Sequence, residues 1–177
     1  EEISNQVNAK VDFKDIDLSL LKNIKNFPNI ALGIDDLTII GIAPFEGDTL
    51  LTIGSTKASL DLMSVIKGEQ YKIEAIDLSD AIVNAIVNKD GIANWNITKP
   101  STDTSASKPF DLALNKLTLD NINLFYDDLN GGTSLKIVNL NHKGKGDFAS
   151  AILDYTSSTA IEKVSFSQGL ITYLKEA

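Results

Sequence analysis

The sequence contains no cysteine and no arginine, and it has a single histidine and a single tryptophan. Without cysteine, a disulfide scaffold, a zinc–thiolate site and a thiol nucleophile are excluded. No apolar run approaches the roughly 18 residues that indicate a membrane span, and no segment has the pattern of a signal peptide. The chain starts at Glu1 without an initiator methionine, so we expect it to be a piece of a longer protein.

Positive charge is scarce, because 16 lysines stand against 24 acidic residues and the net charge is −8. This balance argues against nucleic acid or an anionic membrane surface as the main partner, since both attract positive patches. In LNHKGKGDF, His142, Lys143 and Lys145 suit a small phosphate or headgroup contact. A solvated strand end explains them more simply and is our prediction, because a lone histidine rarely acts without a second ligand or a nucleophile.

Alternation of apolar and polar residues runs through most of the chain, and 43% of its residues are hydrophobic. It is clearest in VNAKVDFK from Val7, KASLDL from Lys57 and FDLAL from Phe110. A period of two indicates strands with one buried and one solvated face, which is typical of antiparallel sheets. We therefore expect one mainly β domain, residues 1–177, built as a curved, mostly antiparallel sheet with one apolar face and a few short helices.

Two short segments have helical spacing, and a third has the composition of a loop. DLSLLKNIKNFP predicts a helical turn from Asp17 to Pro28, and DLMSVIKG predicts one that is capped by Asp61 and ended by Gly68. Residues 98–109, TKPSTDTSASKP, are rich in Ser, Thr, Pro and Lys. Such a segment buries almost nothing, which predicts a flexible loop.

A weak internal repeat continues across that loop. Four segments carry apolar residues at relative positions 0, 3 and 5, and they begin at Ile34, Ile73, Leu114 and Ile161, which are 39, 41 and 47 residues apart. Such periods indicate an array of similar units. Positions 0 and 3 of a regular strand face opposite sides, so each copy requires a bulge or a swap of the buried face.

The segment DAIVNAIVNKDGIANW, Asp80 to Trp95, fits either a helix or a hairpin. An offset of 41 residues places it over NINLFYDDLNGG, which is rich in aromatic residues and Asn and makes a poor helix, with Gly91 over Gly132. The β-branched residues between positions 82 and 87 also favour a strand. We predict a hairpin with Lys89-Asp90-Gly91 as its loop, Gly91 in the left-handed conformation, and Ala93, Trp95 and Ile97 on one face of the returning strand.

No set of residues predicts catalysis or a metal site, so we expect a protein that is not an enzyme and has no cofactor. The acidic pairs Asp15/Asp17, Asp35/Asp36 and Asp127/Asp128 lie beside turn or cap signals, and nothing brings two carboxylates into one apolar pocket. Trp95 in NKDGIANWN suits stacking on a sugar, which leaves a carbohydrate-binding β-domain as one alternative.

Seven segments occur in a characteristic order: VNAKVDFKDIDLSLLKN, FPNIALGIDDLTIIG, FEGDTLLTI, LDLMSVIKGEQYKIEAIDL, VNKDGIANWNI, GKGDF and ITYL. Together they resemble the N-terminal region of AsmA-family proteins in the form found in Bacteroidetes-type bacteria. The resemblance implies a periplasmic location in the cell envelope, with an N-terminal transmembrane helix upstream of Glu1 as an anchor in the inner membrane. It also implies similarity to bridge-like lipid-transfer proteins, in which repeated β-units build a groove.

The resemblance implies a non-enzymatic module that contributes an apolar β-groove for lipid transport and outer-membrane assembly. A sheet face lined by Leu, Ile and Val can hold acyl chains, and burial stabilises them by about 0.8 kcal/mol per CH₂. The implied partners are a phospholipid or another acyl-chain lipid, with envelope assembly proteins as further candidates. The candidate groove residues are Leu37, Ile39, Ile76, Leu78, Val83, Trp95, Leu117, Leu119, Val164 and Phe166.

Two further alternatives stay open on the sequence alone, besides the carbohydrate-binding β-domain. The same apolar residues are compatible with a closed core packed against the short helices. The β-rich pattern is also compatible with a structural or protein-binding module in outer-membrane protein assembly, without lipid transfer.

Overall fold

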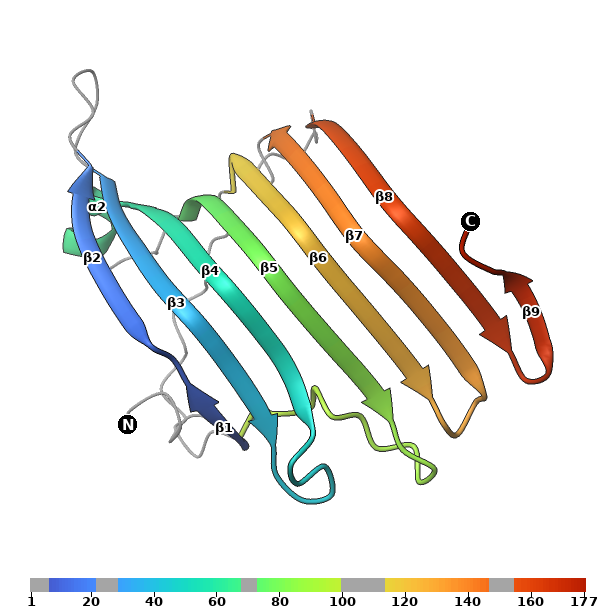
Figure 1. The fold of residues 1–177 in the computed structure, drawn as a ribbon. Coiled ribbons are helices and arrows are strands. Elements are labelled where there is room, and N and C mark those ends of the chain that lie inside the picture. Colours follow the sequence, from blue (N-terminus) through green and yellow to red (C-terminus); the bar gives the residue numbers. More distant parts are fainter. Residues whose placement is uncertain (1–6, 22–28, 68–72, 100–113, 147–154) are drawn as a thin grey trace.

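The computed structural model describes residues 7–21, 29–67, 73–99, 114–146 and 155–177, which form one open sheet of nine strands. The strands are β1 (Ala9–Asp12), β2 (Asp15–Leu21), β3 (Asn29–Gly41), β4 (Thr49–Asp61), β5 (Ile73–Val87), β6 (Lys116–Asp128), β7 (Thr133–Gly146), β8 (Tyr155–Gln168) and β9 (Ile171–Leu174); the helix is α2 (Leu62–Lys67). Their order is β1-β3-β4-β5-β6-β7-β8-β9, with β2 also paired to β3 (Figure 1). All pairs are antiparallel except β5 with β6. The expected mainly β, mostly antiparallel fold is confirmed.

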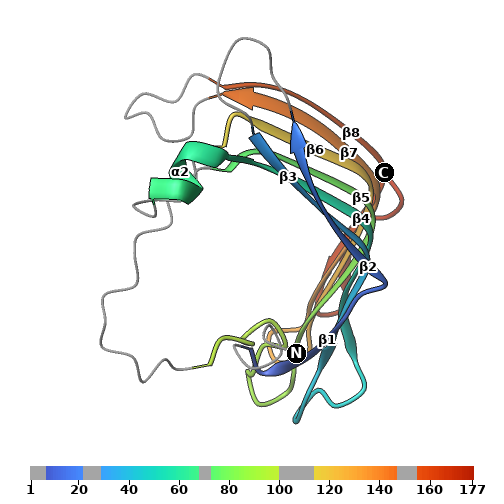
Figure 2. The same cartoon turned by 90° about the vertical axis from the view of Figure 1, so that its left-hand side faces the viewer.

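The sheet curves strongly, and α2 and residues 88–99 lie on its concave side (Figure 2). The chain exposes 11949 Å² of surface, about 1.4 times the ~8,400 Å² expected for a compact protein of 19.1 kDa. Few hydrophobic side chains are fully buried in the described residues, and the buried cluster at the centre of the sheet consists of Ile53, Ala81 and Ile122. The fold is therefore a trough with a thin core.

Neighbouring strands share a kink near their middle. Asp36 in β3, Asp80 in β5, Asn121 in β6 and Asn139 in β7 have positive φ values between 52° and 56°. Gly54 in β4 lies across from both Asp36 and Asp80, and a Cβ atom there would come within 3.1 Å of the Asp80 Cβ. Asp and Asn enter the left-handed region more readily than other non-glycine residues. A line of such irregularities across a sheet bends it.

The kink accounts for the apolar spacing of the repeat. At the kink two consecutive residues point to the convex side, so residues three apart on either side of it share the concave face. Ile34 and Leu37 in β3 are such a pair, and so are Ile161 and Val164 in β8, as their lateral partners indicate. In the second copy of the repeat, the register shift between β4 and β5 leaves Glu74 without a lateral partner. Ile73 and Ile76 therefore also share a face, although they are three residues apart. The third copy of the repeat begins at Leu114, before β6 begins at Lys116, so its first position lies outside the strand.

The parallel pair of β5 and β6 reproduces the 41-residue offset of the sequence repeat. Residues 75 to 79 and 81 to 87 pair with residues 41 positions later in the chain. The 41-residue alignment predicted from the sequence is therefore the same as the register in which β5 pairs with β6. Its direct lateral pairs include Ile76 with Leu117, Leu78 with Leu119 and Val83 with Leu124.

One of the two predicted helical segments is wrong. The chain from Asp17 to Leu21 belongs to β2, which pairs with β3 along seven residues, and the rest of that segment to Pro28 lies outside the described residues. Pairing along a whole strand overrides a weak helical pattern. The second predicted helix is confirmed as α2. Its predicted cap is also confirmed, because the Ser64 amide donates to Asp61 Oδ1 at 2.9 Å. Gly68 lies outside the described residues.

The segment from Asp80 is a strand up to Val87, and Gly91 has the predicted positive φ, at 77°. The predicted returning strand is wrong, because residues 92–98 form only one β-bridge with β5, between Val87 and Ala93, and no ladder. Strand β6 occupies one edge of β5 along its length and β4 occupies the other edge up to Val83, so only the last residues of β5 are free for a returning strand. Residues 100–109 of the predicted loop lie outside the described residues.

Asn94 takes the place of the missing strand. The pairing of β4 with β5 ends at Val83, which leaves the last residues of β5 open on that side. The Asn94 side chain is buried there, accepts from the Ile86 amide at 2.9 Å and donates to the Asn84 carbonyl at 2.7 Å. A side-chain amide thus satisfies backbone groups that a neighbouring strand would otherwise pair.

Candidate functional site: the apolar concave face

Two adjoining rows of side chains are apolar across all six strands from β3 to β8. Neighbours within each row are direct lateral partners, and lateral partners point to the same face of a sheet. Six strands at this spacing make the rows about 24 Å long. We call them the apolar band; one row is Leu37, Ile53, Ala81, Ile122, Leu140 and Ile161, and the other is Ile39, Leu51, Val83, Leu124, Ile137 and Val164.

The contact of Trp95 assigns the apolar band to the concave side. Residues 88–99 lie on that side of the sheet (Figure 2), and the ring centroid of Trp95 lies 6.1 Å from that of Tyr126. Tyr126 is two residues beyond Leu124 on β6, so their side chains share a face. The band therefore lines the inside of the trough.

Nine of the ten candidate groove residues share this concave face, and all nine are half-buried. Four of them belong to the apolar band itself. The other five lie in adjoining rows: Ile76 beside Leu117 and Leu78 beside Leu119 across the kink, and Phe166 beside Leu135 at the opposite margin. Leu78 and Leu119 also pack against the buried cluster of Ala81 and Ile122, which places them on the same face.

Trp95 is the tenth candidate, and it is not on a strand. It belongs to the segment after β5 and is 42% exposed. Its ring reaches over Tyr126, whose lateral partner on β7 is Leu135. Trp95 thus lies at the margin of the concave face rather than within a row.

Beyond the kink, the rows become polar where they reach β7 and β8. The row of Leu78 and Leu119 continues into His142 and Thr159. His142 Nδ1 lies 2.8 Å from Thr159 Oγ1, and its Nε2 lies 2.7 Å from the Tyr155 hydroxyl. Tyr155 reaches His142 by crossing Gly144, where any Cβ atom would overlap its ring. One corner of the trough is therefore hydrogen-bonded and polar.

Within the described residues, no second layer packs against the apolar band. Helix α2 packs against β4 at one margin, and residues 88–99 cover the other margin. Only Ile53, Ala81 and Ile122 of the band are buried, and Ile161 is 41% exposed. The described part of the chain thus forms an open apolar trough and does not close on itself.

Most of the apolar band was absent from the candidates chosen by sequence. Leu51 and Ile53 alternate in LLTIG, which is an ordinary strand signal, but that segment carries no copy of the repeat. Ala81 and Ile122 directly follow the kink residues Asp80 and Asn121. The sequence alone does not show where the kink lies, so the face of the sheet to which Ala81 and Ile122 point could not be predicted.

No helix of the described residues is both long enough and apolar enough to cross a membrane. The chain matches no protein-family model, no curated protein and no solved structure.

Proposed function

We propose that this chain is a non-enzymatic, AsmA-like envelope module whose concave face holds the acyl chains of lipids. In this proposal it acts in the periplasm, within a protein anchored in the inner membrane, and contributes to lipid transport and outer-membrane assembly. The observation that carries the proposal is the apolar band, which crosses six strands without a polar side chain and has no second layer over it in the described residues.

The dimensions and chemistry of the band support an acyl chain as its occupant. One leaflet of a bilayer has a hydrocarbon depth of about 15 Å, which is shorter than the band's length of about 24 Å. Each CH₂ group removed from water contributes about 0.8 kcal/mol. The band has no polar side chain that would fix a chain at one point, so a bound chain is free to slide, as transport requires.

Mass spectrometry of organic extracts from natively purified protein tests the proposal. We expect phospholipid in a reproducible molar ratio to the protein. Lipid-free extracts from both this chain and the longer protein that contains it would contradict the proposal.

Two adjacent substitutions on β8 provide a matched comparison. Val164 lies in the apolar band, whereas Lys163 is the lateral partner of Val138 on the convex face. A buried carboxylate is costly in an apolar site, so we expect Val164→Glu to weaken binding of a neutral fluorescent acyl ester by about tenfold or more. Lys163→Glu should leave it unchanged. Equal effects of the two variants would contradict a ligand on the concave face.

A structural or protein-binding module is the second candidate, and the outer edge of the sheet favours it. Strand β9 pairs with β8 only from Phe166 to Gln168, and Ile171 and Tyr173 are more than half exposed. Open edges and exposed apolar side chains promote association. This candidate predicts lipid-free extracts together with an association that is lost in Ile171→Ser/Tyr173→Ser.

A further inference from the structure

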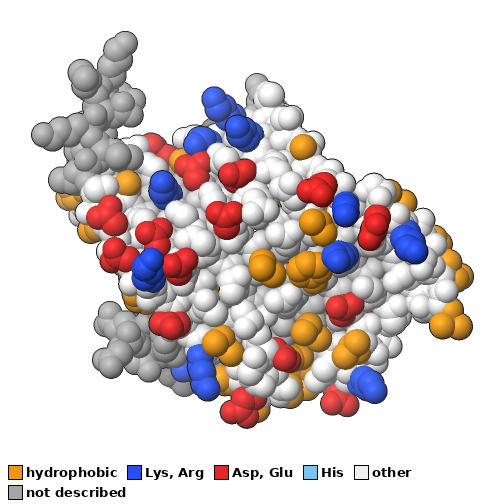
Figure 3. Space-filling model, viewed as in Figure 1, with side chains coloured by type: hydrophobic (Ala, Val, Ile, Leu, Met, Phe, Trp, Pro, Cys, Tyr) orange, Lys and Arg blue, Asp and Glu red, His pale blue; other side chains and the backbone are white. Residues whose placement is uncertain are grey.

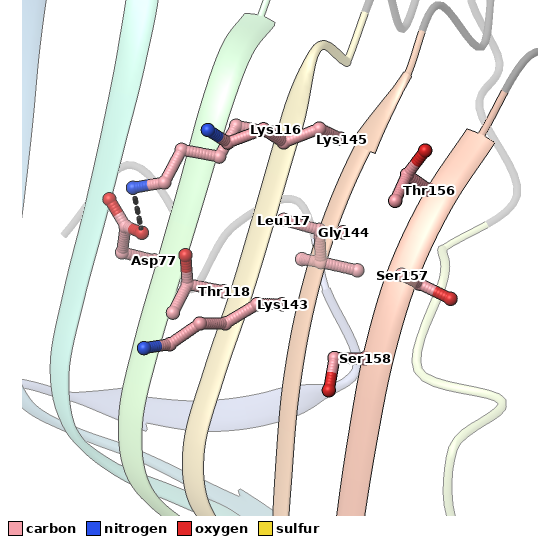
Figure 4. A pocket seen from close by; sticks show the side chains of 10 residues that line it. All are labelled: Asp77, Lys116, Leu117, Thr118, Lys143, Gly144, Lys145, Thr156, Ser157 and Ser158. Atoms are coloured by element: carbon pink, nitrogen blue, oxygen red, sulfur yellow. Dashed lines mark hydrogen bonds and ion pairs between the residues drawn. The ribbon is translucent and has the colours of Figure 1, made fainter.

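Lysine side chains gather at one end of the convex face, where β5 and β6 begin (Figure 3). Lys116 on β6 is the lateral partner of Lys145 on β7, and Lys143 lies two residues away on the same face of β7. The three side chains extend from β6 and β7 toward β5 (Figure 4). Alternation along β7 directs His142 to the concave face, so the histidine of LNHKGKGDF is separated from its two lysines.

These lysines border a cavity of about 550 Å³, which we call the lysine cavity. Thr156 and Ser158 of β8 border its other side (Figure 4). The backbone of Gly144 lies between the two sides. The three ammonium groups lie on the β5 side of the cavity, away from the hydroxyls of β8, so the positive charge gathers on one side (Figure 4).

Positive charge exceeds negative charge around the lysine cavity. Asp77 is the one carboxylate in its lining, and its Oδ1 is 2.7 Å from the Nζ of Lys116. Lys57, the lateral partner of Asp77, adds a further ammonium group nearby. Neither Lys143 nor Lys145 forms an ion pair with any carboxylate of the described residues. In a chain of net charge −8, this is a local reversal of sign.

We propose that the lysine cavity binds a phosphate-bearing anion, the chemistry shared by free phosphate and by the phosphate ester of a lipid headgroup. Lys143 and Lys145, which form no ion pair with a carboxylate of the described residues, donate to the phosphate oxygens. A cavity of about 550 Å³ has room for an ester larger than bare phosphate. This site lies on the face opposite the apolar band and is independent of the proposed acyl-chain function.

NMR titration of ¹⁵N-labelled protein with inorganic phosphate and with glycerol 3-phosphate tests the site. We expect saturable shifts confined to the region of positions 116, 143–145 and 156–158. Raising NaCl from about 50 to about 200 mM should weaken binding, because the contacts are ionic. Tighter binding of glycerol 3-phosphate identifies a headgroup-type ester as the ligand, and equal binding of both identifies free phosphate; either result supports the site.

Variants locate the binding on the chain. Lys143→Gln/Lys145→Gln should weaken binding by about twenty-fivefold, at about fivefold for each lysine near an anionic group. Lys163→Gln, which removes a lysine from the convex face of β8, should change it by less than about twofold. The proposal is overturned if neither anion gives saturable shifts, or if the shifts occur near lysines outside the lysine cavity. It is also overturned if both variants weaken binding equally.

Discussion

Among the described residues, Asp77 is the one whose ionisation the fold most clearly perturbs. Burial raises the pKa of its carboxyl, but hydrogen bonds from Lys116 and Thr118 and the charges of Lys116 and Lys57 outweigh burial and hold the pKa below its ordinary value. A group with a lowered pKa in the folded state stabilises the fold above its ordinary pKa. That contribution is lost as the pH falls through the lowered, folded-state value.

Asp77→Asn tests this balance at the residue scale. Both partners of the ion pair are partly exposed, at 46% for Lys116 and 36% for Asp77, so solvent screens the interaction and we expect a loss of at most about 1 kcal/mol at neutral pH. The difference between the variant and the parent should disappear below the folded-state pKa of Asp77. Urea unfolding at both pH values measures it. A difference of the same size in acid would show that the charge of Asp77 is not the cause.

At the scale of the strand, the kink determines which residues reach the concave face. Asn121 illustrates its chemistry, because its backbone has a φ of 53°, its side chain donates to Asp80 Oδ1 at 2.7 Å, and its amide donates to Asn141 Oδ1 at 3.0 Å. The short polar side chains along the kink therefore bond to one another across strands. This network holds the bend in place.

Replacing Asn121 with either Gly or Val tests the role of the left-handed conformation. Both variants lose the side-chain bond to Asp80, so their difference isolates the backbone. Glycine adopts positive φ freely, whereas a β-branched side chain does not, and we expect Asn121→Val to be less stable than Asn121→Gly by about 1–2 kcal/mol. Urea denaturation measures the difference. Equal stability, or the reverse order, would show that the kink does not require this conformation.

The sequence predicts these elements well where the signal is local and poorly where it depends on a partner strand. Alternation and the 41-residue offset predict the strands and the register of β5 on β6, and Asp61 and Gly91 predict a cap and a turn. Whether Asp17 begins a helix or continues a strand depends on pairing with β3, which local spacing does not contain.

The candidate site shows the same division. The repeat selects eight strand residues and the 41-residue offset adds Val83, and all nine share one face because the kink makes positions three apart equivalent. It misses the members of the apolar band contributed by β4 and β7, since no repeat copy falls on those strands. The placement of Trp95 off the strands depends on β4 and β6 together occupying both edges of β5 up to Val83, tertiary contacts that the hairpin pattern does not reveal.

At the scale of the whole molecule, the two faces of one sheet differ in chemistry. The convex face carries dispersed charged side chains (Figure 3), whereas the concave face carries the apolar band. An open sheet of this kind exposes more apolar surface than a compact domain of equal mass. A bound acyl chain would reduce that exposure, so we expect the lipid-bound protein to be more stable than the lipid-free protein.

Trp95 provides the most direct measurement of whether acyl chains occupy the trough. It is the only tryptophan of the chain, and its ring lies against Tyr126 at the margin of the concave face. Bromine on an acyl chain quenches tryptophan fluorescence only at close range. We expect saturable quenching by a phospholipid with brominated acyl chains, no quenching by the same lipid without bromine, and weaker quenching in Val164→Glu. If the brominated lipid gives no saturable quenching, acyl chains do not bind along this face and the proposed function is wrong.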